Sequence, residues 1–496
     1  MTVALVYPNQ LFADHPALDG ADRVVLHEDD LFFRDEQYPA RNHKLRLVLH
    51  RASMQRYAAR LRDAGHEVEV VAWADRVSTA DLLARLADDG AKTVRLCEPV
   101  DFILEKRLHA AAEAAGVDLD ILDTPLFLTT RAENAAFFEG RKRYFMADYY
   151  KHQRRRLGIL VDDDGEPAGG QWSFDHDNRE TLTKAILAEV PPLPEVEQDA
   201  VIEEAQAYVE EHFPDHVGAS GLLPYPTTRD GAAEWLAAFV AQRFERFGPY
   251  EDAIEPGHSA LYHAVLTPVL NVGLVTPQQV LDAVLGADGI PLNSLEGFVR
   301  QVIGWREYMR ALYDLEGVPL RTANVWGFDR DLPDAWYDGT TGLAPVDDVI
   351  PRVLQTGYAN HIERLMVLGG ALFLTRVHPT QVYRWFMELF VDAYDWVMVP
   401  NAYGMSQHAA GPLLTTKPYM SGSNYLRKMS HYPRGDWEAE WDGLYWTFLR
   451  DYREPIEGYH RMAMITGHLD RMGEDKMAAH EAAADRYLKR IGIDDA

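Results

Sequence analysis

Short apolar runs alternate with amphipathic segments over the first 130 residues of the chain. Five of these runs are rich in apolar and β-branched residues and are predicted to be strands: VALVYP, RVVLHED, EVEVVAW, TVRLCEP and DLDILDTP. Helical patterns lie between them, for example KLRLVLHRASMQRYAARLRDAG, which ends on a Gly stop signal. Strands that alternate with helices predict an α/β domain in which helices cover both faces of a parallel sheet. Such sheets bind ligands at the carboxyl ends of their strands, although no G-x-G-x-x-G or Walker loop is present.

Residues 131–225 have a more polar pattern. FFEGRKRYFMADYYKHQRRRLG is compatible with a helix and is the densest basic stretch of the chain, whereas VDDDGEPAGGQWSFDHDNRE and EVPPLPEVEQDA have the composition of loops or linkers. A charge run is commonly just a solvated helix face, and a contact to a phosphate backbone is an equally weighted alternative here. The second interpretation selects Arg141, Lys142 and Arg154 as candidate phosphate contacts.

From residue 226 to the end the pattern is helical, with turn signals between segments. The predicted helices include AAEWLAAFVAQRFERFG, SLEGFVRQVIGWREYMRALYDLEG, VDDVIPRVLQTGYANHIERLMVLGGALFL and HPTQVYRWFMELFVDAYDWV. This region is rich in Trp and Tyr, which usually serve packing but also suit a planar, redox-active ligand. The sequence therefore predicts an α/β domain over 1–130, a linker with a basic helix over 131–225, and an all-helical domain over 226–496.

Composition adds a bias in charge. The 496 residues include 77 acidic and 49 basic ones, only ten of them Lys, for a formal net charge of −28. A strongly acidic, Lys-poor surface suits concentrated salt and suggests a halophilic, archaeal-type source, with an ordinary acidic cytosolic enzyme as the alternative. A nucleic-acid partner would need a local basic patch. With no membrane-length apolar run, we expect a soluble, cytoplasmic monomer.

Several motifs of the helical region resemble one known family. GWREYM, NHIERLMV, RWFMELFVDAYDW, PNAYGMSQ and TKPYMSGSNY, in this order and spacing, are similar to the FAD-binding domain of the photolyase/cryptochrome superfamily. Within it the chain most resembles the bacterial and archaeal branch that usually carries an iron-sulfur cluster and includes (6-4) photolyases. The resemblance implies a Rossmann-like antenna domain followed by a helical FAD domain. It also implies light-driven repair, in which excited reduced FAD donates an electron to a damaged pyrimidine pair flipped out of UV-damaged DNA.

The same resemblance assigns residues to the cofactor. Arg364 matches the arginine beside the flavin, and Asp392 matches its acidic partner. The remaining matches to positions that contact FAD are Tyr250, His263, Thr267, Arg306, Asp395 and Asn401.

His361 matches the catalytic histidine of (6-4) photolyases, which transfers a proton to the lesion, where cyclobutane-dimer photolyases carry Asn. Asn360 precedes it where many relatives have a second His. Glu307 matches a lesion-contacting carboxylate, Tyr419 is a candidate for the lesion pocket, and Lys417 joins Arg141, Lys142 and Arg154 as a candidate DNA contact. The competing interpretation of His361 is a hydrogen-bonded core histidine.

Two departures limit the resemblance. Cluster-bearing relatives use four cysteines, whereas Cys97 is the only one here and Pro433 stands at one ligand position, so we predict no iron-sulfur cluster and no other metal. In the electron-supply chain Trp385 matches the flavin-proximal tryptophan and Tyr337 stands near a position often held by Trp; core packing is an equal interpretation. A lumazine antenna pigment near Asn9, His27 and Glu28 is a weaker expectation, because Phe32 replaces an expected carboxylate.

Three functions remain open on the sequence. The first is a (6-4) photolyase without a cluster. The second is a cryptochrome-like blue-light receptor that signals through a protein partner. The third is a flavoprotein scaffold that binds nucleic acid or protein without light chemistry. Repair activity, photoreduction without repair, and absence of bound FAD would distinguish the three.

Overall fold

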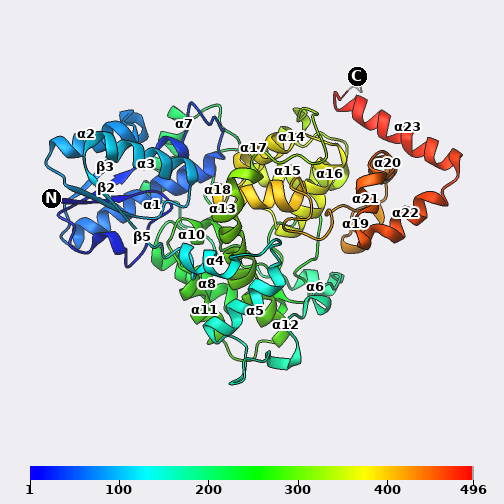
Figure 1. The fold of residues 1–496 in the computed structure, drawn as a ribbon, viewed down its shortest axis with the longest axis horizontal. Coiled ribbons are helices and arrows are strands. Elements are labelled where there is room, and N and C mark those ends of the chain that lie inside the picture. Colours follow the sequence, from blue (N-terminus) through cyan, green and yellow to red (C-terminus); the bar gives the residue numbers. More distant parts are fainter. Residues whose placement is uncertain (494–496) are drawn as a thin grey trace.

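The computed structural model describes residues 1–493 and begins with a five-stranded parallel sheet (Figure 1). The strands are β1 (Thr2–Val6), β2 (Arg23–His27), β3 (Val68–Val71), β4 (Thr93–Cys97) and β5 (Asp118–Leu122), in the spatial order β3-β2-β1-β4-β5. In the register, Val3 is opposite Arg23 and Thr93 is opposite Asp118. All five predicted strands are confirmed, and β1 is buried over Val3–Val6, as expected for a parallel sheet covered on both faces.

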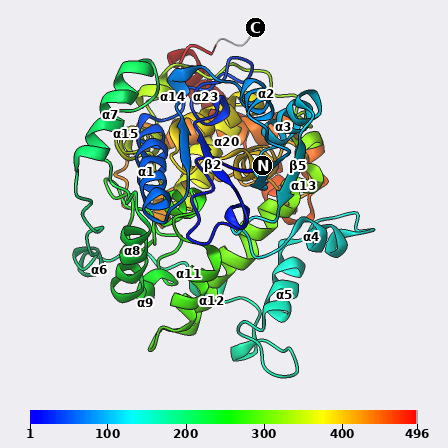
Figure 2. The same ribbon diagram turned by 90° about the vertical axis from the view of Figure 1, so that its left-hand side faces the viewer.

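Helices cover both faces of this sheet. Figure 2 shows α1 (Lys44–Asp63) and α7 (Ala200–His212) on one side of the strands, with α2 (Thr79–Asp88) and α3 (Phe102–Ala115) on the other. Helix α7 packs on α1 although it comes from the region predicted as a linker. Part of that region therefore belongs, in space, to the N-terminal lobe.

The rest of the chain is mainly helical, which confirms the α/β plus all-α fold class. In the sequence, α4 (Arg131–Phe138), α5 (Met146–Leu157) and α6 (Lys184–Ala188) come between β5 and α7. The helical lobe contains α8 (Arg229–Gln242), α9 (Phe244–Phe247), α10 (Thr267–Asn271), α11 (Pro277–Leu285), α12 (Leu292–Val299), α13 (Glu307–Leu320), α14 (Ala335–Asp338), α15 (Ala344–Thr356), α16 (Gly370–Leu374), α17 (Pro379–Leu389), α18 (Asp395–Met398), α19 (Ser423–Met429), α20 (Asp436–Asp451), α21 (Arg453–Glu457), α22 (Ala463–Asp470) and α23 (Glu474–Arg490).

Three stretches that the sequence predicts as continuous helices are interrupted. The basic stretch breaks between α4 and α5, the segment after α17 is non-helical before α18, and α15 ends at Thr356. Gly357 then has φ of +66°, and an added Cβ would lie 2.3 Å from Cγ1 of Val391. Only glycine fits this left-handed turn, which places His361 at the start of the following helix.

Three further segments are π-helical: Arg300–Arg306, Glu363–Gly369 and Val399–Ser406. Such wide turns are rare and often mark functional sites, because the extra residue shifts which side chains share a face. Among residues 1–493, no helix combines the length and apolar character needed to span a membrane.

Candidate functional site

One cavity collects residues from all three π-helical segments and from the loop before α10. The empty volume of the cavity is about 1670 Å³, and this figure includes the solvent-filled space at its opening. Aromatic and aliphatic side chains form most of the wall, with a few polar groups at defined places. Its aromatic wall consists of Phe247, Phe298, Trp305, Tyr358, Phe386 and Trp396. This combination suits a large, partly planar ligand.

A buried ion pair lies on one side of the cavity. Arg364 donates from its two terminal nitrogens to the Asp392 carboxylate at 2.8 and 2.9 Å, and the two side chains are 13% and 4% exposed. Thr267 donates its hydroxyl to the same carboxylate, and Asn271 donates to the Asp392 carbonyl. The guanidinium group is thereby fixed in one orientation at the cavity wall.

A second cation, Arg306, reaches the cavity from the first π-helical segment. It lies between the rings of Phe127 and Trp396, 5.0 and 4.7 Å from their centroids. Its hydrogen-bond acceptors, Asn271 Oδ1 and the Leu126 carbonyl, are neutral. Burial lowers the pKa of Arg306 to about 10, while the Glu307 carboxyl opposes this shift. A buried cation with neutral acceptors favours an anionic ligand group nearby.

Two histidines, His361 and His263, line the same cavity. His361 is open to the cavity although protein surrounds it, and this burial, followed by the positive charge of Arg364, lowers its pKa to about 4. Burial also lowers the pKa of His263 to about 4, and His361 adds to that shift. The Nε2 atom of His263 is buried without a hydrogen-bond partner in the described chain. Both rings are therefore neutral at neutral pH.

A carboxyl group and an amide that the sequence motifs did not indicate complete this wall. Gln301 donates to Glu251 Oε1 at 2.5 Å, and Asn178 donates to Glu251 Oε2 at 3.1 Å. Burial raises the pKa of Glu251 to about 7 and that of its neighbour Asp252 to about 6. Glu251 and Gln301 are fifty residues apart in sequence, so only the folded chain brings them together.

The structure brings together seven of the predicted site residues and separates others from them. The seven at the cavity are His263, Thr267, Arg306, His361, Arg364, Asp392 and Asn401. Asn401 donates to the Val397 carbonyl at 2.7 Å. Asn360 does not line the cavity; its side-chain amide is buried and unpaired within residues 1–493.

Two predicted cofactor contacts face elsewhere. Tyr250 packs in a small separate cluster with Tyr262. Asp395 accepts hydrogen bonds from Tyr313 and Tyr383 and pairs with Arg321. Neither side chain is positioned to touch a ligand in the cavity, so their assignment to the cofactor does not fit this geometry.

Glu307 also points away from the cavity. Its carboxylate is fully buried and accepts the Leu128 backbone N–H at 3.0 Å. Trp305 lines the cavity, and two residues along a helix turn a side chain by about 200°. Glu307 is therefore on the side of the helix opposite the cavity, and its role as a lesion contact stays a prediction. Gln301, about one turn earlier than Trp305, faces the cavity.

The candidate phosphate contacts differ in exposure. Arg141 and Lys142 are exposed in the turn between α4 and α5. Arg154 is 0% exposed and donates to the carbonyls of Ile159, Leu160 and Trp172, so it cannot contact DNA in this structure. The charge run is solvated on one side of α5 only. Lys417 and Tyr419 are partly exposed in the loop before α19, and Tyr419 lies close enough to Tyr308 to affect its pKa.

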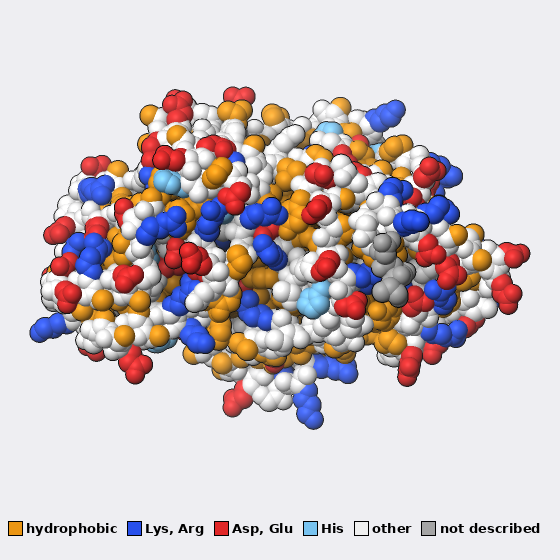
Figure 3. Space-filling model, turned by 90° about the horizontal axis from the view of Figure 1, so that it is seen from above, with side chains coloured by type: hydrophobic (Ala, Val, Ile, Leu, Met, Phe, Trp, Pro, Cys, Tyr) orange, Lys and Arg blue, Asp and Glu red, His pale blue; other side chains and the backbone are white. Residues whose placement is uncertain are grey.

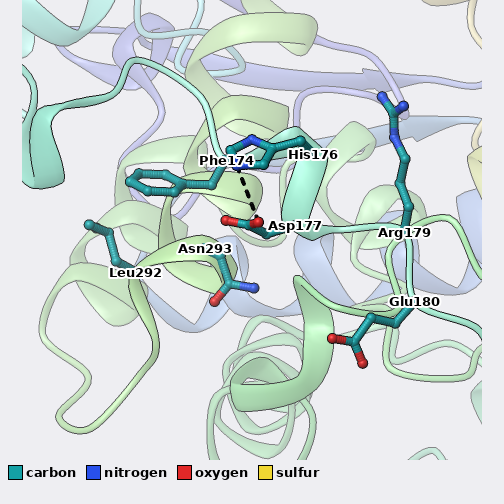
Figure 4. A pocket seen from close by; sticks show the side chains of 7 residues that line it. All are labelled: Phe174, His176, Asp177, Arg179, Glu180, Leu292 and Asn293. Atoms are coloured by element: carbon teal, nitrogen blue, oxygen red, sulfur yellow. Dashed lines mark ion pairs between the residues drawn. The ribbon is translucent and has the colours of Figure 1, made fainter.

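A surface groove adjoins the main cavity. Figure 4 shows Asp177 and Asn293 side by side beneath His176, with Arg179 at one side. His176 lies 3.2 Å from Asp177. Arg179 lies 3.8 Å from Asp252, which itself lines the main cavity. The groove is open and carries charges of both signs.

The predicted antenna residues lie at the carboxyl ends of β1 and β2. Asn9 Oδ1 and His27 Nδ1 are buried without hydrogen-bond partners in the described residues, although His27 Nδ1 lies 3.7 Å from the Asp29 carboxylate. Glu28 already accepts from Arg51 at 3.0 Å. Phe32 packs 6.0 Å from the Tyr7 ring. The antenna pigment stays a prediction.

A parallel sheet joined to a helical lobe with an aromatic, cation-lined cavity defines an α/β plus all-α protein built to enclose a large planar ligand. The family model for deoxyribodipyrimidine photo-lyase-related proteins matches residues 4–222. A (6-4) photolyase of Agrobacterium fabrum is 33% identical over 510 aligned residues that cover 99% of each chain. The chain belongs to the photolyase/cryptochrome superfamily.

Solved structures share the fold. A bacterial class III photolyase from Agrobacterium tumefaciens has a TM-score of 0.58 and 16% identity, covering 100% of this chain and 92% of that one. A Synechocystis cryptochrome has a TM-score of 0.59 and 14% identity, covering 100% of this chain and 94% of that one. At these identities the likeness describes the fold alone.

Proposed function

We propose that this protein is a light-driven DNA-repair flavoprotein that reverses (6-4) photoproducts, with FAD in the cavity and without an iron-sulfur cluster. The observation that carries the proposal is one cavity shared by His361 and the Arg364–Asp392 pair. The full-length relative described as a (6-4) photolyase supports the same choice.

The cavity residues fit FAD. The aromatic wall suits its planar rings, and the buried cation of Arg306 suits a negatively charged group. Arg364 and Asn401 supply N–H donors at the cavity wall. FAD, when bound, reduced and excited by light, supplies the electron for repair.

The side chains of this protein have three roles in the proposed reaction. Arg364 balances negative charge in the cavity, and Asp392 holds it in place. His361 Nε2 or Nδ1 delivers a proton to the flipped-out lesion. Because His361 is neutral at neutral pH in the free protein, an anionic group in the cavity has to raise its pKa before it can act as the donor.

The proposal needs no thiolate cluster. Cys97 is the only cysteine of the chain; it ends β4 and is buried in the N-terminal lobe. Burial raises the pKa of its thiol to about 12, which disfavours the thiolate that metal ligation requires. Elemental analysis of protein purified without oxygen tests this part, and stoichiometric bound iron would contradict it.

DNA would be held by a local patch rather than by the overall charge. Arg141 and Lys142 are exposed beside α5, and α5 packs on the π-helical segment that carries Trp305 and Arg306. Phosphate contacts of this kind position a duplex without reading its sequence.

The test is a repair assay in high salt with chemically reduced protein under near-UV or blue light. One oligonucleotide carries a (6-4) photoproduct and the other a cyclobutane dimer. We expect repair of the first only, and its loss in His361→Ala with flavin still bound. His109→Ala, an exposed histidine on α3, is the matched control. Unchanged repair in His361→Ala would refute the assignment, and photoreduction without any repair would identify a light receptor instead.

A further inference from the structure

The start of the helix that carries His361 is anchored on two sides. Arg364 is fixed on one side by its two hydrogen bonds to Asp392. On the other side Glu363 accepts the backbone N–H of Asn360 through its Oε2 atom at 3.3 Å. His361 lies between these anchored residues and lines the cavity. The direction of its ring therefore depends on the backbone that the two anchors hold.

Asn360 stands at the first, capping position of this helix, but its side chain does not cap it. Its carbonyl oxygen accepts the first bond of the helix, from the Arg364 N–H at 3.1 Å. An asparagine at this position ordinarily accepts a helix N–H with its side-chain oxygen. Here both polar atoms of the amide are buried without a hydrogen-bond partner in residues 1–493. Glu363 alone supplies the side-chain bond, as one half of a capping box.

Arg352, on α15, holds the Glu363 carboxylate from outside. Its Nη2 atom donates to Glu363 Oε1 at 2.6 Å and to Asp348 Oδ2 at 2.9 Å. Its Nη1 atom donates to the His258 carbonyl and to Ser259 Oγ, both at 3.1 Å. The Arg352 and Glu363 side chains are 12% and 1% exposed. Each oxygen of Glu363 thus has its own donor, one from a guanidinium and one from the start of the helix.

The ion pair is tied to three other segments of the helical lobe. Asp348, one turn before Arg352 on α15, also accepts the Gly257 N–H at 3.1 Å and the Tyr432 hydroxyl at 3.0 Å. Charged side chains of both signs are scattered over the upper face of the molecule (Figure 3), and exposed pairs of that kind contribute little. The Glu363 carboxylate differs from them because it is buried and because its second oxygen reaches the backbone beside His361.

We propose that Glu363, held by Arg352, is the positioning residue of the proton donor His361. The inference rests on the proposed function, in which His361 acts on a flipped-out lesion. Asn360 offers a second way to start this helix, because its free amide can accept a helix N–H when its backbone turns. Glu363 holds the Asn360 N–H and thereby selects the first arrangement. The imidazole of His361 is then directed into the cavity before a lesion arrives.

The anchor needs a carboxylate. Burial raises the pKa of Glu363, and the positive charge of Arg352 opposes this shift. A carboxylate has two acceptor oxygens, whereas an amide has one oxygen and an N–H₂ group. In Glu363→Gln the guanidinium takes that single oxygen, because its hydrogen bond is charge-assisted. The N–H₂ group then faces the N–H of Asn360, so the bond is lost although the side chain keeps its size.

The second variant reverses this loss. Replacing Arg352 with Met in the Glu363→Gln protein removes the competing donor. The glutamine oxygen is then free to accept the Asn360 N–H again. Recovery by a second substitution separates a positioning role from a merely structural one, because it adds no contact to the cavity.

The experiment uses full-length, flavin-loaded and chemically reduced protein in high salt with an oligonucleotide that carries a (6-4) photoproduct. In Glu363→Gln we expect repair per absorbed photon at saturating oligonucleotide to fall at least about tenfold, because a displacement of about 1 Å can cost about 10²-fold. Flavin content and the dissociation constant, from absorbance and fluorescence anisotropy, should stay unchanged. Arg352→Met added to this variant should restore repair. Glu440→Gln is the matched control, because Glu440 is buried and pairs with Arg490 at 2.6 Å away from the cavity.

Hydrogen exchange, followed by mass spectrometry, tests the anchor without light. The peptide over residues 357–364 should exchange at least about tenfold faster in Glu363→Gln and return to the wild-type rate in the double variant. The Glu440→Gln control should leave the exchange of this peptide unchanged.

Either reading can overturn the inference. Unchanged repair in Glu363→Gln refutes the positioning role, and so does a loss of repair that is matched by a loss of flavin and of oligonucleotide affinity. A double variant that binds flavin but does not regain repair refutes the competition between Arg352 and Asn360. If the wild-type protein repairs neither lesion, the proposed function fails, and exchange alone decides the anchor: an unchanged rate in Glu363→Gln refutes it.

Discussion

Replacement of Asp392 with Asn removes the counter-charge of Arg364 and keeps the size of the side chain. The pair makes two charge-assisted hydrogen bonds, at 2.8 and 2.9 Å, and is almost fully buried. In the variant one amide group faces donors from Arg364 and Thr267, so at least one donor loses its acceptor. Breaking a buried pair in this way costs about 3–5 kcal/mol. Because the entropy of unfolding grows with chain length, we expect the melting temperature to fall by roughly 3–5 °C and bound flavin to be lost.

Thermal unfolding and the flavin-to-protein absorbance ratio measure the two effects. Asp120→Asn is the matched control, because it removes the partner of Arg95 in a pair whose side chains are 39% and 29% exposed. Such a pair contributes about 0–1 kcal/mol. An Asp392→Asn protein with the melting temperature and flavin content of the control would refute the claim that this pair organises the cavity.

Three further predictions follow from charge and burial. His43, His50 and His408 are 0% exposed, and burial lowers the pKa of His43 and His408 to about 4 and that of His50 further. Because these values lie below the unfolded value of about 6.5, the stabilisation is complete above that pH and is lost as the pH falls toward about 4. Urea unfolding at fixed high salt measures this, and a free energy of unfolding that stays constant from pH 7 to pH 5 would contradict it. Arg141→Ala and Lys142→Ala should each weaken DNA binding and lower the slope of log affinity against log salt by about 1, by fluorescence anisotropy; an unchanged slope would remove them from the interface. Finally, the pKa of His361 should rise from about 4 when reduced flavin binds, as followed by NMR of ¹⁵N-labelled histidine, and a value that stays near 4 would exclude it as the proton donor.

The sequence predicted the sheet well because each strand is a short apolar run bounded by turn residues. The sequence also predicted that the C-terminal lobe is helical, but it did not predict where the individual helices are interrupted. In the sequence, Gly357 lies within a continuous helical pattern. In the structure, Val391, thirty-four positions later, packs against it. Local pattern does not contain that contact, and the contact decides where the helix carrying His361 begins.

The sequence places a residue at the cavity where a family motif specifies both the residue and the side of the helix on which it lies. Arg364 and Asp392 are twenty-eight residues apart, yet the family motifs already paired them. The side chain of Glu307 faces away from the cavity because it lies two residues after Trp305 on the helix, and the π-helical turn before it changes the phase further. Arg154 is turned inward for a related reason: a basic run on one helix still directs some of its side chains toward the protein interior, where backbone carbonyls accept their hydrogen bonds.

Charges of both signs line the cavity, with the carboxyl groups of Glu251, Asp252 and Asp392 beside two arginines. Arg364 is paired with Asp392, whereas the hydrogen-bond acceptors of Arg306 within residues 1–493 are neutral. The surrounding protein desolvates His361 and His263, which lowers both pKa values, and Arg364 opposes a second positive charge at His361. An anion in this cavity would gain from Arg306 and would at the same time favour protonation of His361. Binding of an anionic reduced cofactor and protonation of the proton donor His361 are therefore two effects of one electrostatic arrangement.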